Sequence, residues 1–342
     1  MSIKAFICGV EGFTLTGPER DFLRAEQPWG FILFKRNVSD RAQVAALVAE
    51  LRSCVGRADA PVLIDQEGGR VQRLQPPQWP KYPRGAVFSA LYDSSKDLGL
   101  RAAWLSARLI ADDLAELGVT VDCLPLADVP VAGADAVIGD RAYGTEPAKV
   151  AAIAQAVTDG LEAGGVLPIL KHIPGHGRAT ADTHFLLPVV ETARDELERT
   201  DFAAFRPLAG LPMAMTAHVV FSALDAAQPA TTSATIIREV IRGWIGFQGL
   251  LMSDDVSMNA LEGTIAERSR ASIAAGCDMI LHCNGKADEM AEVAANSPVL
   301  AGEALARADA ALKARKQPQP LDRAKARAEL DDLVARAGAL TA

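Results

Sequence analysis

The sequence predicts an α/β protein built as a single (β/α)8 barrel. Short runs of β-branched and aliphatic residues recur along the 342-residue chain, and longer stretches with helical periodicity separate many of them. Strands that alternate with helices in this way pair in parallel through crossover helices. Nearly continuous apolar strands are typical of a sheet that is covered on both faces.

Eight apolar runs are the candidate strands. They occupy residues 5–10, 30–34, 61–65, 119–124, 166–170, 213–217, 250–253 and 279–282. Helical patterns occupy residues 40–55, 98–117, 145–163 and 233–245, and the last three of these stop at glycines. Eight strands suit a closed barrel, and the first strand-to-helix turn lacks the G-x-G-x-x-G pattern of a dinucleotide-binding sheet.

The last part of the chain, residues 301–342, has a different composition. It is rich in alanine and charged residues and is broken by the sequence QPQP at residues 317–320. We interpret it as helices packed outside a barrel of residues 1–300, and not as a separate domain. A flexible tail is the alternative.

Composition excludes several classes of protein. The 35 Lys and Arg against 43 Asp and Glu give a net charge of -8, which has the wrong sign for a protein that binds nucleic acid. The five cysteines are scattered without a C-x-x-C pair, which disfavours disulfides and zinc ribbons and favours a reducing compartment. The first residues resemble neither a signal peptide nor a membrane span, so a cytoplasmic protein without a membrane partner is expected.

Polar residues follow seven of the eight runs. In a barrel these positions lie at the C-terminal ends of the strands, where the catalytic residues are found. The densest segment is 171–184, which holds three of the five histidines. His172 and His176 have the H-x-x-x-H spacing of metal ligands, but Pro174 and Gly175 between them remove the shared helix face on which that spacing depends. Metal ligation and hydrogen bonding within an irregular loop both remain open for these two histidines.

Two further candidates are the pair Asp182 and His184 and the adjacent carboxylates Asp254 and Asp255. Asp182 and His184 can lie on the same side of an extended loop, where the carboxylate would orient a histidine general acid and base; an Asx-type turn is the alternative. Asp254 and Asp255 follow the seventh run directly, and neighbours on a strand point to opposite faces. We expect one carboxylate in the pocket, ionised beside Lys171 or Arg141, and Asp255 as a cap of the next helix.

Taken together, six ordered motifs resemble a bacterial family 3 glycoside hydrolase, and more closely the short, single-domain β-N-acetylhexosaminidases of peptidoglycan recycling. The resemblance covers roughly residues 1–290. The motifs are DQEGGRVQR at 65–73, GDRAYG at 139–144, KHIPGHG at 171–177, DTH at 182–184, TAH at 216–218 and SDDVSM at 253–258.

The resemblance implies a role for each motif. Asp254 would be the nucleophile that forms a covalent glycosyl-enzyme, and His184, oriented by Asp182, would be the acid and then the base. No cofactor and no metal is implied. The terminal N-acetylglucosamine would be bound by Asp65, Arg73, Arg141, Lys171 and His172.

A histidine in place of one of the two usual carboxyl groups fits cytoplasmic pH, because imidazole titrates near neutrality without a charged neighbour. The glycine-rich loop would bring the dyad to Asp254 only when substrate is present. The expected substrate is a small carbohydrate, a muropeptide-like disaccharide, and the expected protein is a monomer. The rivals are a metal-dependent hydrolase that uses His172, His176 and a carboxylate, and a non-catalytic sugar-binding barrel.

Overall fold

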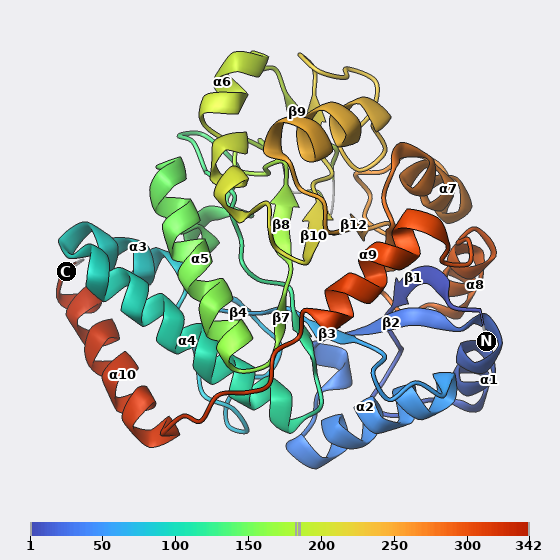
Figure 1. Ribbon diagram of the computed structural model, residues 1–342, viewed down its shortest axis with the longest axis horizontal. Coiled ribbons are helices and arrows are strands. Elements are labelled where there is room, and N and C mark those ends of the chain that lie inside the picture. Colours follow the sequence, from blue (N-terminus) through green and yellow to red (C-terminus); the bar gives the residue numbers. More distant parts are fainter. Residues whose placement is uncertain (1, 182, 184–185, 341–342) are drawn as a thin grey trace.

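The fold is a barrel of parallel strands surrounded by helices, as predicted (Figure 1). The structure is a computed structural model and describes residues 2–181, 183 and 186–340. The main sheet has the strand order β7-β6-β3-β2-β1-β13-β12-β10-β8. Its strands are β1 (Lys4–Cys8), β2 (Pro28–Leu33), β3 (Val62–Ile64), β6 (Val121–Asp122), β7 (Leu167–Pro168), β8 (Leu170–Ile173), β10 (Met213–Thr216), β12 (Leu250–Asp255) and β13 (Met279–His282).

The two edges of this sheet belong to one segment of chain, residues 167–173. β7 pairs with β6, and β8, which begins two residues after β7 ends, pairs with β10 on the other side. The backbone N–H of Ile169 between them donates to the carbonyl of Leu124 at 2.7 Å. The fifth predicted run therefore closes the barrel, and it extends to Ile173, so that Lys171 and His172 lie in a strand and not in the predicted loop.

The predicted helices are confirmed, with small differences at their ends. They are α2 (Arg41–Val55), α4 (Lys96–Glu116), α5 (Pro147–Ala163) and η5 (Ile236–Ile245). Asp40 caps α2 by accepting from the backbone N–H of Gln43 at 3.0 Å, and Gly56 ends it at a φ of 63°. Thr16 and Glu19 form a capping box that begins α1 (Gly17–Glu26), a helix that was not predicted.

Further helices complete the ring around the strands. Thr264 caps α7, so the prediction that Asp255 caps the next helix is wrong. These elements are α1 (Gly17–Glu26), α3 (Gly85–Ser94), α6 (Arg194–Arg199), α7 (Ile265–Ala275) and α8 (Ala287–Ala295), with short turns η1 (Lys35–Asn37), η2 (Gly139–Arg141), η3 (Phe202–Ala204) and η4 (Arg206–Leu208).

Alternate residues of most strands face the inside of the barrel, where they form one apolar cluster. The residues between them face the surrounding helices and belong to a second, larger cluster. In β12, for example, Leu250 and Met252 lie inside while Leu251 packs outward. This period of two places Asp254, the next inward position, directly above the interior cluster.

The C-terminal helices do two different things. α9 (Gly302–Lys313) contributes Ala308 and Ala311 to the interior cluster, and Arg307 pairs with Asp278 just before β13. α9 therefore packs on the barrel at the end where the strands begin. α10 (Arg323–Leu340) does pack outside, alongside α4 and α3 (Figure 1), with Leu330 buried.

Two small strand pairs lie apart from the main sheet. β4 (Gln66–Gly68) and β5 (Val71–Gln72) form an antiparallel hairpin after β3, and β9 (Val189–Val190) pairs with β11 (Val220–Phe221). The hairpin turn needs Gly68 and Gly69, whose φ angles are 97° and 58°. Over the described part of the chain, no helix is both long and apolar enough to cross a membrane.

Candidate active site

A cavity of about 350 Å³ opens at the end of the barrel where the strands finish. Ile32, Met215 and Leu281 of the interior cluster form its apolar base. The polar residues above this base come from several strand ends, as the barrel predicts. They include Asp65, Glu67, Arg73, Arg141, Lys171, His172, His176, Thr183, Asp254 and Asp255.

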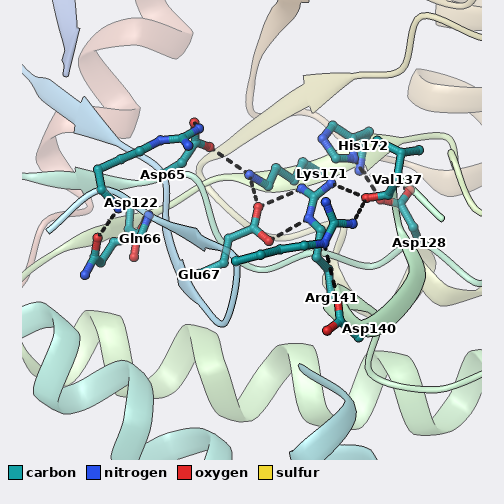
Figure 2. Close-up of polar contacts among 12 residues, drawn as sticks. Asp65, Gln66, Glu67, Asp122, Asp128, Val137, Asp140, Arg141, Lys171 and His172 are labelled. Carbon is teal, nitrogen blue, oxygen red and sulfur yellow. Dashed lines mark hydrogen bonds and ion pairs between the residues drawn. The ribbon is translucent and has the colours of Figure 1, made fainter. Parts of the chain in front are cut away.

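Lys171 is the centre of an ion-pair network on one side of the cavity (Figure 2). Its ammonium lies 2.9 Å from Asp65 and 2.7 Å from Glu67, and its side chain is only 2% exposed. Arg73 pairs with the second oxygen of Asp65 at 2.9 Å. Arg141 forms a bidentate pair with Glu67 at 2.7 and 2.8 Å. The three cations thus pair with these two carboxylates. Among the described residues none of them forms an ion pair with Asp254, in contrast to the expectation that Lys171 or Arg141 would lie beside it.

The network keeps its carboxylates ionised. Burial alone would raise the pKa of Asp65, but the charges of Lys171 and Arg73 lower it far below its usual range. Burial acts against Glu67 in the same way, yet Arg141 and Lys171 lower its pKa to about 2. Burial opposes the charge of Lys171, and the two carboxylates more than offset this, so its pKa is raised. The site therefore presents fixed charges at neutral pH.

Asp128 organises the two histidines on the neighbouring side. Its Oδ2 accepts from His172 Nδ1 at 2.7 Å, and its Oδ1 accepts from the backbone N–H groups of His172 and His176 at 3.3 and 2.7 Å. Burial opposes its ionisation, but His172 leads the contacts that lower its pKa. An ionised Asp128 fixes the His172 tautomer with its proton on Nδ1, so Nε2 is the nitrogen available to a ligand in the cavity.

Asp254 lies half-buried at the end of β12. Its backbone N–H donates to the Thr216 hydroxyl at 3.2 Å, and its Oδ1 accepts from the backbone N–H of Asp255 at 2.8 Å. Burial raises its pKa, but His218 and His172 are the first of several neighbours that lower it below its usual value. Asp254 is therefore an ionised carboxylate in the cavity, held by hydrogen bonds that fix its direction.

The carboxylate of Asp255 is committed to local structure. It accepts from the hydroxyl and backbone N–H of Ser257 at 2.7 and 2.9 Å, and from the backbone N–H of Cys283 at 3.1 Å. It joins the turn after β12 to the end of β13. Of the two adjacent carboxylates, Asp254 is the one that retains an oxygen for chemistry.

Asp182 and His184 lie outside the described residues, so the expected dyad and its distance from Asp254 stay predictions. Thr183 between them is described. It is buried, lines the cavity and lies 3.4 Å from His176 Nε2. Its carbonyl accepts from the backbone N–H of Ala260 at 3.2 Å. Thr183 thus links this loop to the cavity.

His176 is expected to make the stability of the protein depend on pH. Burial, followed by His172, lowers its pKa from 6.5 to about 4. The unfolded chain therefore binds more protons than the folded chain between these two pH values, and stability falls as the pH decreases through this window. His176→Gln should lessen the loss of unfolding free energy between pH 7.5 and 4.5 by roughly 2 to 3 kcal/mol.

Urea denaturation of both proteins at the two pH values measures this difference. The His176→Gln protein also serves as its own control at pH 7.5, where any packing defect appears without titration. Equal losses for wild type and variant would show that His176 titrates normally.

Comparison with known proteins decides the family. Residues 14–313 match the glycosyl hydrolase family 3 N-terminal domain. The β-hexosaminidase of Tolumonas auensis is 38% identical over 290 residues, which cover 82% of this chain and 83% of that protein. The chain belongs to glycosyl hydrolase family 3.

The fold comparison agrees with this membership. NagZ from Neisseria gonorrhoeae in complex with N-trifluoroacetyl-D-glucosamine has a TM-score of 0.88 at 31% identity. A structure of the same protein in complex with a zinc ion has a TM-score of 0.87 at 30% identity. Each covers 98% of this chain and 99% of NagZ. This family 3 protein is a glycoside hydrolase, and α10 lies beyond its family-matching stretch.

Two residues of this family 3 site were not assigned from the sequence. Glu67 stands in the DQEGGR motif, but nothing local indicates that it pairs with Lys171 and Arg141, which are far away along the chain. Asp128 lies shortly after the fourth apolar run, residues 119–124, and no role was predicted for it. A carboxylate placed two residues after the inward-facing Asp65 could have been recognised as a second charge at the same strand end.

Proposed function

We propose that this glycoside hydrolase is an exo-acting β-N-acetylglucosaminidase that removes terminal N-acetylglucosamine with retention of configuration. The observation that carries the proposal is the ionised, hydrogen-bonded Asp254 in a cavity whose other side is a fixed network of charges. The relatives support the choice of sugar, since they include β-hexosaminidases and a NagZ complexed with an N-acylated glucosamine analogue.

Asp254 is proposed to attack the anomeric carbon. Its lowered pKa leaves it ionised at neutral pH, which a nucleophile requires. In the first step a C–O bond forms between Asp254 and the sugar while the bond to the leaving oxygen breaks. Water then cleaves this ester linkage, and the product keeps the original configuration.

The ion-pair network is proposed to bind the sugar hydroxyls. Ionised Asp65 accepts hydrogen bonds, whereas Lys171, Arg73 and Arg141 donate them. His172 presents Nε2 to the same cavity because Asp128 engages its Nδ1. Since these groups are already paired with one another, they need little reorganisation when the sugar arrives.

His184, oriented by Asp182, is proposed to protonate the leaving oxygen and afterwards to take a proton from water. His184 would thus be the general acid and base of the reaction. None of the cavity residues described above is assigned this role. Thr183 supports it, because this residue of the same loop lines the cavity. The proposed substrates are muropeptide-like disaccharides, and the proposed enzyme is a cytoplasmic monomer of peptidoglycan recycling.

The metal-dependent alternative has less support from the site. Asp128 engages His172 Nδ1, and the His172 and His176 rings lie 5.7 Å apart. Within the described residues, no three His, Cys, Asp or Glu side chains are grouped as ligands of a metal ion. The relative solved with a zinc ion makes a direct test necessary.

The His184→Ala variant tests the proposal through leaving-group dependence. The kcat/KM for an alkyl β-N-acetylglucosaminide, a poor leaving group, should fall by about 10² to 10⁴. For a dinitrophenyl β-N-acetylglucosaminide the loss should be less than about tenfold, because a good leaving group needs little protonation. Steady-state rates with both substrates provide the measurement.

Wild-type enzyme treated with EDTA is the control for metal chemistry. Full activity after EDTA is expected, and activity that is abolished by EDTA and restored by zinc would favour the alternative. Equal losses for the two leaving groups would remove His184 from the acid role, and a wild type inactive on both substrates would contradict the proposed function.

A further inference from the structure

The motif TAH at residues 216–218 is the one among the six ordered motifs that supplies no residue to the proposed reaction or sugar site. Thr216 ends β10, and His218 follows two residues later. Both side chains are 0% exposed, as is that of Thr231, which lies between β11 and η5. A substrate cannot touch these three side chains, so any part that they take in the reaction is through another residue.

The three side chains form a chain of hydrogen bonds that begins and ends on the backbone of Asp254 and Asp255. We call it the Thr–His chain. The backbone N–H of Asp254 donates to Thr216 Oγ1 at 3.2 Å. Thr216 Oγ1 lies 2.7 Å from Thr231 Oγ1, and the latter lies 2.7 Å from His218 Nδ1. His218 Nε2 lies 3.0 Å from the carbonyl oxygen of Asp255. The Thr–His chain therefore holds one backbone group on each side of the peptide bond between the two aspartates.

The direction of each hydrogen bond follows from the chemistry of the groups. A carbonyl oxygen only accepts, so His218 Nε2 carries a proton and donates it to Asp255. In a neutral imidazole Nδ1 is then an acceptor, so the Thr231 hydroxyl donates to it and accepts from the Thr216 hydroxyl. A protonated imidazole would instead donate to Thr231, whose hydroxyl would then donate to the Ala217 carbonyl at 3.1 Å. In both arrangements every donor of the Thr–His chain has a partner, and such a buried network is rigid.

The Thr–His chain fixes the backbone from which the Asp254 carboxylate projects. The backbone N–H of Asp255 donates to Asp254 Oδ1 at 2.8 Å, so the orientation of this peptide group sets the direction of the carboxylate. The Asp255 carbonyl that accepts from His218 also accepts from the backbone N–H of Met258 at 3.1 Å. A displacement of about 1 Å in a reacting group can lower a rate by about a hundredfold, so the support of this backbone matters for the reaction.

We propose that Thr216, Thr231 and His218 are positioning residues for the Asp254 nucleophile. The inference rests on the proposed function and extends it to side chains that the substrate does not touch. Loss of one link should lower the rate of the chemical step, because the carboxylate then meets the anomeric carbon in fewer productive orientations. Binding of the sugar should change little, because the proposed sugar ligands belong to the ion-pair network around Lys171.

Thr231→Val tests the Thr–His chain by removing one hydroxyl with little change in the size of the side chain. For an aryl β-N-acetylglucosaminide, kcat should fall by about 10- to 100-fold while KM changes by less than about twofold. Thr231→Ser keeps the hydroxyl and should retain kcat within about threefold. His218→Phe removes both ring nitrogens and should give the same pattern as Thr231→Val. Melting temperatures verify that each variant is folded.

Chemical rescue separates the positioning of Asp254 from a general defect. In the Asp254→Gly protein, azide takes the place of the carboxylate, so the direction of that carboxylate no longer matters. Thr231→Val should therefore change the azide-rescued rate by less than about twofold, although it lowers the rate strongly when Asp254 is present. The matched control is Thr158→Val, which alters another buried threonine, one whose hydroxyl has no hydrogen-bond partner among the described residues. It should keep the wild-type kinetics.

Three results would overturn the proposal: an unchanged kcat in Thr231→Val, a rise in KM alone, or an equal fall in the azide-rescued reaction. Each of them leaves the proposed function intact, because the wild-type enzyme still hydrolyses the aryl β-N-acetylglucosaminide. A wild-type enzyme that does not hydrolyse this substrate would contradict the proposed function and the positioning role together.

Discussion

Asp254→Asn is expected to lower kcat/KM for an aryl β-N-acetylglucosaminide by about four orders of magnitude or more. The amide keeps the size of the side chain and an oxygen that accepts from the Asp255 backbone N–H, now 2.8 Å away. It removes the negative charge that would form the bond to the sugar. The effect should therefore fall on the chemical step and leave the melting temperature nearly unchanged.

Asp255→Asn is the matched control, since it makes the same change in the adjacent residue. Its carboxylate holds Ser257 and Cys283 and has no proposed chemical role, so a loss of less than about tenfold is expected. Azide added to an Asp254→Gly protein should restore turnover of the aryl substrate and give the α-glycosyl azide. An Asp254→Asn enzyme with undiminished kcat/KM would rule out Asp254 as the nucleophile.

Lys171→Met should produce the largest loss of stability, about 3 to 5 kcal/mol in the free energy of unfolding at pH 7. The substitution leaves Asp65 and Glu67 near one another with one cation fewer, in a place where water cannot solvate them well. Activity should be lost as well, because both carboxylates belong to the proposed sugar site. Urea denaturation and rates on the aryl substrate measure the two effects.

The deficit of Lys171→Met should become smaller at pH 4. In the wild type the lowered pKa of Glu67 contributes stability that is present above its ordinary value of 4.5 and is lost as the pH falls toward about 2. Without Lys171 this contribution is smaller from the start, so the two proteins converge in acid. Lys316→Met removes an exposed lysine from its pair with Glu162 and should cost less than about 1 kcal/mol; an equal cost for Lys171→Met would contradict the importance of the network.

The fold was largely predictable because its signals are local. Apolar runs predicted the strands, and helical periodicity predicted the main helices. Asp40 and Gly56 mark the ends of α2. The position of α9 was not predictable from its composition. Alanines such as Ala308 and Ala311 suit an exposed helix and a tightly packed one equally, and only the tertiary structure places them across the barrel end.

Most residues of the site could be predicted from the sequence, but the ion pairs between them could not. Strand ends of a barrel meet at one rim, so Asp65, Lys171 and Asp254 could be expected near one another. Which charges pair depends on contacts between residues far apart in the sequence, such as Glu67 with Arg141. These partners became apparent only from the structure. The structure pairs the cations with Asp65 and Glu67, whereas the prediction had placed them beside Asp254.

The segment 167–173 joins the two edges of the sheet and also carries Lys171 and His172. Any local opening of the barrel at this seam would pull the ammonium away from two buried carboxylates, which makes such an opening unfavourable. The seam should consequently exchange its amide hydrogens slowly, as part of the most protected unit of the protein. In this enzyme the ion pairs that position the side chains of the site also stabilise the closed barrel at the point where its two sheet edges meet.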